Sequence, residues 1–244
     1  MNLRNTSIVL AVTYFCGQLI ALLLTSTIKF KPIVGQGGNL FIGFIIALTL
    51  LILLIKFKLI KIWRAWYTLA VLLSITLTFS IMLAPFYAFL IAILFTVTKM
   101  LHKTAISHNL TELFIYPGLA ILFTPHFDVL SISLLLVIIA VYDMFSVWRS
   151  KHMIMLAKAQ EKADMYTGYY LPMNKGHIFL GGGDIAFPML FTSVMFHTYG
   201  WTALIIPFFT TAAVYSLFKL KQKYFPAMLV LSLACLLTLP FFLV

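Results

Sequence analysis

The 244-residue sequence is 63% hydrophobic and only 9% charged, whereas a soluble globular domain carries about 25% charged residues. This composition excludes a soluble enzyme or soluble binding domain and indicates a protein that crosses the membrane several times. The net charge of +11 comes from short basic clusters between apolar runs, so membrane lipids, and not nucleic acid, are the expected counter-charges.

A membrane-spanning helix needs about twenty apolar residues, and the sequence predicts an all-α integral membrane protein with a single transmembrane domain. We expect nine spans over residues 7–26, 39–55, 65–83, 86–98, 109–124, 129–148, 177–199, 201–218 and 226–244. Spans four and five could instead share a hairpin that does not fully cross. Lys99, just after span four, is expected to snorkel toward the interface. Pro226 is expected at the first helical position of span nine.

The basic residues indicate the orientation of these spans. With the N-terminus in the cytoplasm and the C-terminus outside, 15 of the 17 lysines and arginines fall on the cytoplasmic side, as the positive-inside rule requires. The protein is therefore predicted to be a multi-pass cell-membrane protein with a cytoplasmic loop over residues 149–176. Within this loop, the aromatic and threonine residues of Tyr166–Tyr170 favour extended chain over helix.

Two of the six acidic residues lie inside predicted spans, Asp143 in span six and Asp184 in span seven. A carboxylate at membrane depth is costly and usually functional. Asp184 follows three glycines, which allow close backbone approach. Pro188 has no N–H to donate to the carbonyl of Asp184, so the helix is loosened there.

The two acids are expected at matching depth. At the rise of an α-helix, Asp143 lies about 9 Å from Arg149, and Asp184 lies about 10 Å from His177, at the same face. Antiparallel neighbouring helices could bring both carboxyl groups to one water molecule. Two close carboxyl groups share a proton, so one can act as general base and the other as general acid in peptide hydrolysis.

The residues alone leave other interpretations open. Each acid could be paired with a basic residue for stability, although no lysine or arginine lies in the middle of a predicted span. The same acids could relay protons in a proton- or ion-coupled transporter or channel, although the chain lacks the two similar halves common in transporters. His152, His177 and His197 form no ligand cluster, so neither a metal nor a cofactor is expected.

Three motifs then point to one family. Tyr142–Asp143, Gly181–Asp184 and Pro226–Met228 resemble, in order and spacing, the YD, GxGD and PAL motifs of the presenilin and signal-peptide-peptidase family of intramembrane aspartyl proteases. Met228 replaces the leucine of PAL, a swap of similar volume. The run from Gly183 to Pro188 resembles the prokaryotic branch. Prepilin peptidases also carry GxGD, but they usually have lysine where this chain has Ala186, and they lack the Pro-Ala element.

The resemblance implies a presenilin-like fold and roles for these residues. Asp143 and Asp184 would be the catalytic pair, and the site would be completed by Tyr142, Gly181, Gly182, Gly183, Pro226, Ala227 and Met228. The substrate would be a transmembrane helix or remnant signal peptide, unwound at the cleavage site, to which Tyr166–Asn174 could add a strand. The loop between spans six and seven has no long insertion, so a single-chain enzyme is expected. The sequence also shows no obvious surface for obligate accessory subunits, and none are expected.

Overall fold

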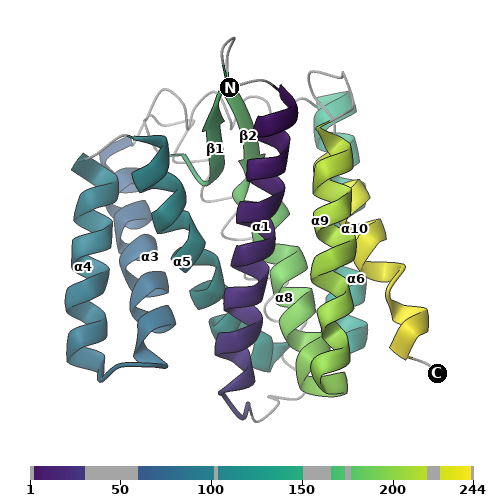
Figure 1. Ribbon diagram of the computed structural model, residues 1–244, viewed down its shortest axis with the longest axis horizontal. Coiled ribbons are helices and arrows are strands. Elements are labelled where there is room, and N and C mark those ends of the chain that lie inside the picture. Colours follow the sequence, from purple (N-terminus) through teal and green to yellow (C-terminus); the bar gives the residue numbers. More distant parts are fainter. Residues whose placement is uncertain are drawn as a thin grey trace.

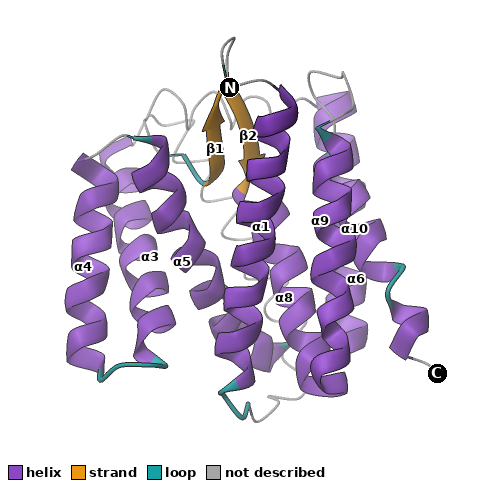
Figure 2. Ribbon diagram, viewed as in Figure 1, coloured by secondary structure: helices purple, strands orange, loops and turns teal. Residues whose placement is uncertain are grey.

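The computed structural model describes residues 3–30, 60–101, 104–150, 166–173, 177–218 and 226–242, which form a helical bundle with one β-hairpin (Figures 1 and 2). The helices are α1 (Leu3–Ser26), α3 (Ile60–Ser80), α4 (Pro85–Leu101), α5 (Ala105–Phe123), α6 (Val129–Phe145), α8 (Gly182–Tyr199), α9 (Ile205–Leu217) and α10 (Ala227–Leu236). The strands are β1 (Gly168–Pro172) and β2 (His177–Gly181). The expected span 39–55 and residues 151–165 of the cytoplasmic loop lie outside the described residues.

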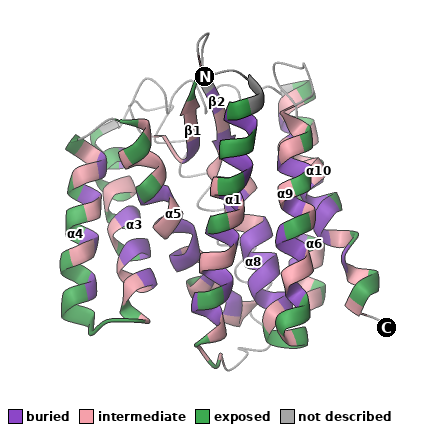
Figure 3. Ribbon diagram, in the orientation of Figure 1, coloured by how far each residue is buried: buried purple, intermediate pink, exposed green. Residues whose placement is uncertain are grey.

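Several helices are long and apolar enough to cross a membrane. Among the described residues, these segments are Asn5–Ser26, Lys61–Ser80, Val129–Arg149 and Gly182–Leu217, and shorter apolar helices occupy Pro85–Leu101 and Ala227–Phe242. Large apolar side chains remain exposed on the outward faces of the bundle, for example Phe86 and Leu94 on α4 (Figure 3). Such surfaces are suited to lipid.

The helices pack as two groups around α1. Helix α3 packs against α4 and α5, and α1 packs against α5, α8 and α9 (Figure 1). On the other side, α10 packs against α6, α8 and α9. Gly118 of α5 lies so close to α3 that a Cβ there would collide with the backbone oxygen of Ser74. A small residue at this crossing therefore allows the two backbones to approach.

Local sequence signals explain several helix ends. Asp128 caps α6 by accepting from the backbone N–H of Ser131 at 2.7 Å, and the Ser131 hydroxyl lies 2.9 Å from the Asp128 N–H. This reciprocal arrangement is a capping box. Thr104 caps α5 with a single bond, by accepting from Ser107 N–H at 3.2 Å. Gly200, with φ +69°, ends α8 in a conformation that L side chains rarely adopt.

The expected span seven is wrong at its start. His177–Gly181 is a β-strand, and the helix begins at Gly182. The apolar run could be read either way, because hydropathy does not separate a short buried strand from the first turns of a helix. The depth estimate that counted helical rise from His177 to Asp184 therefore does not apply.

The expected span nine also differs. Pro226 is the N-cap of α10 and not its first helical residue. Helix α10 ends at Leu236, and a 3-10 segment, Leu239–Phe242, follows a turn. Pro240 lies inside that segment and has no N–H to continue an α-helix.

Candidate active site

Asp184 lies in the first turn of α8, immediately after the hairpin. Gly181 is the N-cap of this helix, and its backbone hydrogen-bonds the Asp184 carboxyl group. A Cβ at Gly181 would lie 3.0 Å from Asp184 Oδ2, so the glycine allows this close approach. An acid in the first turn that reaches back to the N-cap is favoured by the unpaired N–H groups and the dipole of the helix.

Proline loosens the same helix one turn later. Pro188 lies inside α8, so the carbonyl of Asp184 lacks the N–H that a helix would normally supply from that position. The sequence-based interpretation of Pro188 therefore holds for the helix as the structure has it.

Asp143 lies near the end of α6 and is buried, with 6% of its surface exposed. Its own carbonyl accepts from the backbone N–H of Ser146, where α6 passes into a π-helical turn, Ser146–Ser150. Irregular turns of this kind inside helices are frequent at functional sites.

The third motif contacts Asp143 directly. The backbone N–H of Met228, in the first turn of α10, donates to Asp143 Oδ2 at 3.1 Å. One turn further on, the Ser232 hydroxyl donates to the carbonyl of Leu136 on α6 at 3.2 Å. These two bonds fix the start of α10 against the helix that carries Asp143.

The structure places Asp143 and Asp184 on neighbouring helices. Helices α6 and α8 pack against each other, and the two carboxyl groups are close enough for their charges to interact. The described residues offer neither acid a lysine or arginine partner, since the salt bridges among them involve other groups. An acid pair without a counter-cation can hold one proton between its members, as general acid–base chemistry requires.

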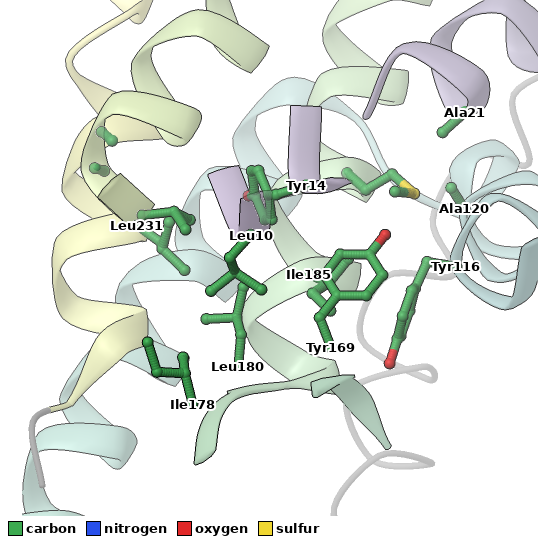
Figure 4. Packing of buried hydrophobic residues seen from close by; sticks show 14 residues of the cluster. Leu10, Tyr14, Ala21, Tyr116, Ala120, Tyr169, Ile178, Leu180, Ile185 and Leu231 are labelled. Carbon is green, nitrogen blue, oxygen red and sulfur yellow. The ribbon is translucent and has the colours of Figure 1, made fainter. Parts of the chain in front are cut away.

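The hairpin before Asp184 is antiparallel, with Gly168 opposite Gly181 and Tyr170 opposite Phe179. Gly168 has φ +120°, and a Cβ there would collide with the backbone oxygen of Leu180. The predicted extended chain over Tyr166–Tyr170 thus includes the first residues of β1. The side chain of Tyr169 points into a buried cluster with Leu180 and Ile185 (Figure 4).

A buried polar network holds the opposite edge of β1. Lys99 Nζ donates to Glu112 Oε1 at 2.5 Å, and the exposed fractions of the two side chains are 4% and 1%. The Tyr116 hydroxyl and the Gly168 N–H both donate to Glu112 Oε2, the latter at 2.9 Å. The expectation that Lys99 snorkels to the interface is wrong, because a buried carboxylate holds its ammonium group inside the bundle.

The predicted site residues divide into two sets. Those that the structure brings together at the acids are Asp143, Asp184, Gly181 and Met228, while Pro226 and Ala227 open α10 beside them and Gly182 and Gly183 open α8. Tyr142 is half-buried next to Asp143, and its role stays a prediction. Within the described residues, no group of three or more His, Cys, Asp or Glu could hold a metal ion.

Sequence reasoning missed the network on α5. His108, Glu112 and Tyr116 recur every four residues, so they share one face of the helix. That spacing, with a carboxylate inside an apolar helix, was a usable signal. Asn109 and Gly168 carried no such signal, because their roles depend on the position of β1.

Comparison with known proteins identifies the family. A family model described as signal-peptide peptidase, presenilin aspartyl protease matches residues 39–234. A search of curated proteins gives no match.

Solved structures share the fold. A presenilin family intramembrane aspartate protease in space group C222 has 21% identity over 97% of this chain and 98% of its own, with a TM-score of 0.69. A structure of a protein of the same description in space group P2 has 20% identity over 96% and 94% of the two chains, also with a TM-score of 0.69. The chain therefore belongs to the signal-peptide peptidase and presenilin family, and it is an intramembrane aspartyl protease.

Proposed function

We propose that Asp143 and Asp184 are the catalytic pair of this protease and activate one water molecule between them. The observation that carries the proposal is their proximity on two packed helices, together with the absence of a cationic partner among the described residues. The ionised carboxylate takes a proton from water as the general base. The protonated carboxyl polarises the scissile carbonyl and then protonates the leaving amine.

Each acid has a neighbouring group that favours its ionised form. The Met228 N–H favours a negative charge on Asp143, and the first turn of α8 favours one on Asp184. The two acids share one proton, so the pair carries a single negative charge. During the catalytic cycle the two carboxyl groups exchange the roles of general base and general acid. Gly181, Gly182 and Gly183 leave the backbone before Asp184 without side chains that would obstruct a substrate.

The substrate is proposed to be a transmembrane helix that becomes extended beside β2. A helical peptide bond is shielded, and strand addition to an exposed edge would present it to the acids. Along an antiparallel pair, the backbone N–H and C=O groups of successive residues alternately bond to the partner strand and point away from it. The backbone N–H and C=O groups of Gly168 and Tyr170 point away from β2, since they bond to side chains of α5.

The backbone groups of their partners on β2, Gly181 and Phe179, therefore point away from β1. None of the hydrogen bonds of the described residues uses the outward groups of Phe179. The earlier assignment of the substrate strand to Tyr166–Asn174 thus moves to the other strand, because the outer edge of β1 is filled. The edge of β2 ends three residues before Asp184, so a strand added there would reach the acids.

We also propose the nine-span topology with a cytoplasmic N-terminus. The N-terminus lies at the same end of the molecule as the hairpin (Figure 1), which agrees with a cytoplasmic loop over 149–176. The clustering of basic residues supports the same orientation. A single chain without obligate accessory subunits and without a cofactor remains our expectation, with transmembrane peptides and membrane lipids as partners.

The test is cleavage of a transmembrane reporter peptide in liposomes. Asp143→Asn and Asp184→Asn should each abolish cleavage, whereas Asp128→Asn, outside the site, should retain it. A transition-state mimic of peptide hydrolysis should inhibit the wild type, because such compounds bind the acid pair. Normal cleavage by either site variant would refute the assignment. Proton-driven ion flux without hydrolysis would instead favour the transporter interpretation.

A further inference from the structure

Side chains of α5 occupy the outer edge of β1 in the way that a third strand would. The Gly168 N–H donates to Glu112 Oε2 at 2.9 Å, and the Gly168 carbonyl accepts from His108 Nε2 at 2.7 Å. The Tyr170 N–H donates to Asn109 Oδ1 at 2.8 Å, and its carbonyl accepts from Asn109 Nδ2 at 2.7 Å. All four outward backbone groups of these two residues are therefore paired.

We infer that His108, Asn109 and Glu112 keep the hairpin folded before substrate arrives and act as positioning residues for the substrate strand. An isolated two-stranded hairpin is marginally stable, and these strands are only five residues each. His108 and Glu112, four residues apart, share one face of α5, and Asn109 beside them also reaches β1, so one helix presents all three side chains to the strand. This inference rests on the proposed function, since it assigns the hairpin to substrate binding.

The Lys99–Glu112 ion pair fixes the set in place. Glu112 accepts from Lys99, Tyr116 and Gly168. Lys99 Nζ also lies 3.1 Å from His108 Nδ1. The ammonium can only donate, so Nδ1 accepts and Nε2 carries the proton that His108 donates to Gly168. One lysine thus orients both the carboxylate and the imidazole that bind β1.

The network also reaches the turn before Asp184. A Cβ at Gly182 would lie 2.9 Å from the Tyr116 hydroxyl and 3.3 Å from the Cβ of Thr167. The Gly182 N–H donates to the carbonyl of Thr167 at 3.1 Å. The hairpin, its edge on α5 and the start of α8 are consequently one connected unit that ends two residues before Asp184.

Pre-ordering the hairpin has a defined kinetic consequence. If the hairpin opened in the free enzyme, substrate would bind only the ordered fraction, and the apparent affinity would fall by that fraction. The bound complex would still be ordered. Loss of the edge contacts should therefore raise KM for the transmembrane substrate and leave kcat nearly unchanged.

Asn109→Leu is the variant that tests this, because it removes both bonds to Tyr170 without changing charge. KM should rise by up to about thirtyfold, because the two lost hydrogen bonds are worth about 1 kcal/mol net each and every 1.4 kcal/mol is a factor of ten. Amide hydrogen exchange over residues 166–173 should become faster. Leu110→Ala, at the exposed neighbouring position, is the matched control and should change neither quantity. Unchanged KM and unchanged exchange in Asn109→Leu would overturn the inference, as would a fall in kcat alone.

A second pair of variants tests the ion pair. Glu112→Gln leaves the Lys99 ammonium buried without its counter-charge, so it should speed hairpin exchange and raise KM. Lys99→Met/Glu112→Gln removes both charges and keeps an amide oxygen for the Gly168 N–H, so it should slow exchange and lower KM part of the way toward the wild-type values, while His108 still lacks the lysine that orients it. A double variant no better than Glu112→Gln would contradict a positioning role for the pair.

The exchange measurement separates this inference from the assignment of the dyad. It can be made on Asp184→Asn, which should show the same protected hairpin as the wild type. If Asp143→Asn and Asp184→Asn cleaved normally, the dyad would be wrong while the hairpin result stood. If the dyad variants were inactive and Asn109→Leu bound substrate normally, only the positioning role would be lost.

Discussion

The backbone N–H of Met228 donates to Oδ2 of Asp143 at 3.1 Å, so the first turn of α10 binds a carboxylate carried by α6. The first N–H groups of any helix lack partners within the helix. Here one of them is satisfied by an acid more than eighty residues earlier in the chain. The Pro-Ala-Met element is thereby tied to the candidate dyad through its backbone.

Removing this donor should impair catalysis. Met228→Pro deletes the N–H, and a hydrogen bond to a charged group contributes roughly 1.5–3 kcal/mol. We therefore expect cleavage of the reporter to fall roughly tenfold to a hundredfold, measured as kcat/KM in liposomes. Met228→Leu keeps the N–H and a similar volume, so it should stay near the wild-type rate. Equal losses in both variants would show that the side chain, and not the backbone donor, matters.

The sequence predicted the chemistry of the site better than its geometry. Asp143 and Asp184 could be singled out because a carboxylate inside an apolar run is costly wherever the helices pack. The three motifs then predicted that both acids and Met228 belong to one site, and the structure shows the contact of Met228 with Asp143. These inferences needed only residue type and order, and they survive the error in where the helix of span seven begins.

The strand β2 and the network on α5 could not be predicted from the same patterns. His177–Gly181 is apolar and would read equally as helix, and only its pairing with β1 makes it a strand. Lys99 and Glu112 lie 13 positions apart on different helices, so their contact depends on how α4 packs on α5. Expecting Lys99 to snorkel ignored the possibility of a buried partner.

The glycines before Asp184 should differ in tolerance. A Cβ at Gly181 would approach Asp184 Oδ2 to 3.0 Å, whereas one at Gly183 would meet only Phe187, at an ordinary 3.6 Å. Gly181→Ala should therefore displace the carboxyl group and reduce kcat. Gly183→Ala should fold normally, because alanine favours a helix over glycine by about 1 kcal/mol. Cleavage rates and thermal midpoints in detergent would check this, and the reverse order of activity would contradict it.

Two glycines with positive φ should separate stability from function. Gly168→Ala forces φ +120° on an L residue and places a Cβ against the Leu180 carbonyl, so the hairpin should open. We expect KM to rise at least as much as in Asn109→Leu. Gly200→Ala, with φ +69° and open space around it, should cost about 1–3 kcal/mol of stability through backbone strain and leave KM unchanged. Kinetics below both thermal midpoints, with circular dichroism as the folding check, would distinguish the two.

The cap of α6 should give the protein a defined acid dependence. Hydrogen bonds from the side chain and backbone of Ser131 lower the pKa of Asp128 below its usual range. A group with a lowered folded-state pKa contributes stability above its unfolded value, about 3.9, and loses it as the pH falls through the folded value. At pH 7, Asp128→Ala should cost about 1 kcal/mol of stability, the usual value of an N-cap.

Thermal midpoints in detergent at pH 7 and near pH 3 would measure this effect. The difference between wild type and Asp128→Ala should shrink at the lower pH, because the protonated side chain no longer presents a full charge to the helix N-terminus. Asp128→Asn keeps an oxygen acceptor for the Ser131 N–H without a titrating proton. It should match the wild type closely at pH 7, since asparagine is an equally good N-cap, and its margin over Asp128→Ala should stay constant with pH. If the difference in thermal midpoint from Asp128→Ala shrank at low pH as much for Asp128→Asn as for the wild type, the acid dependence would come from other groups.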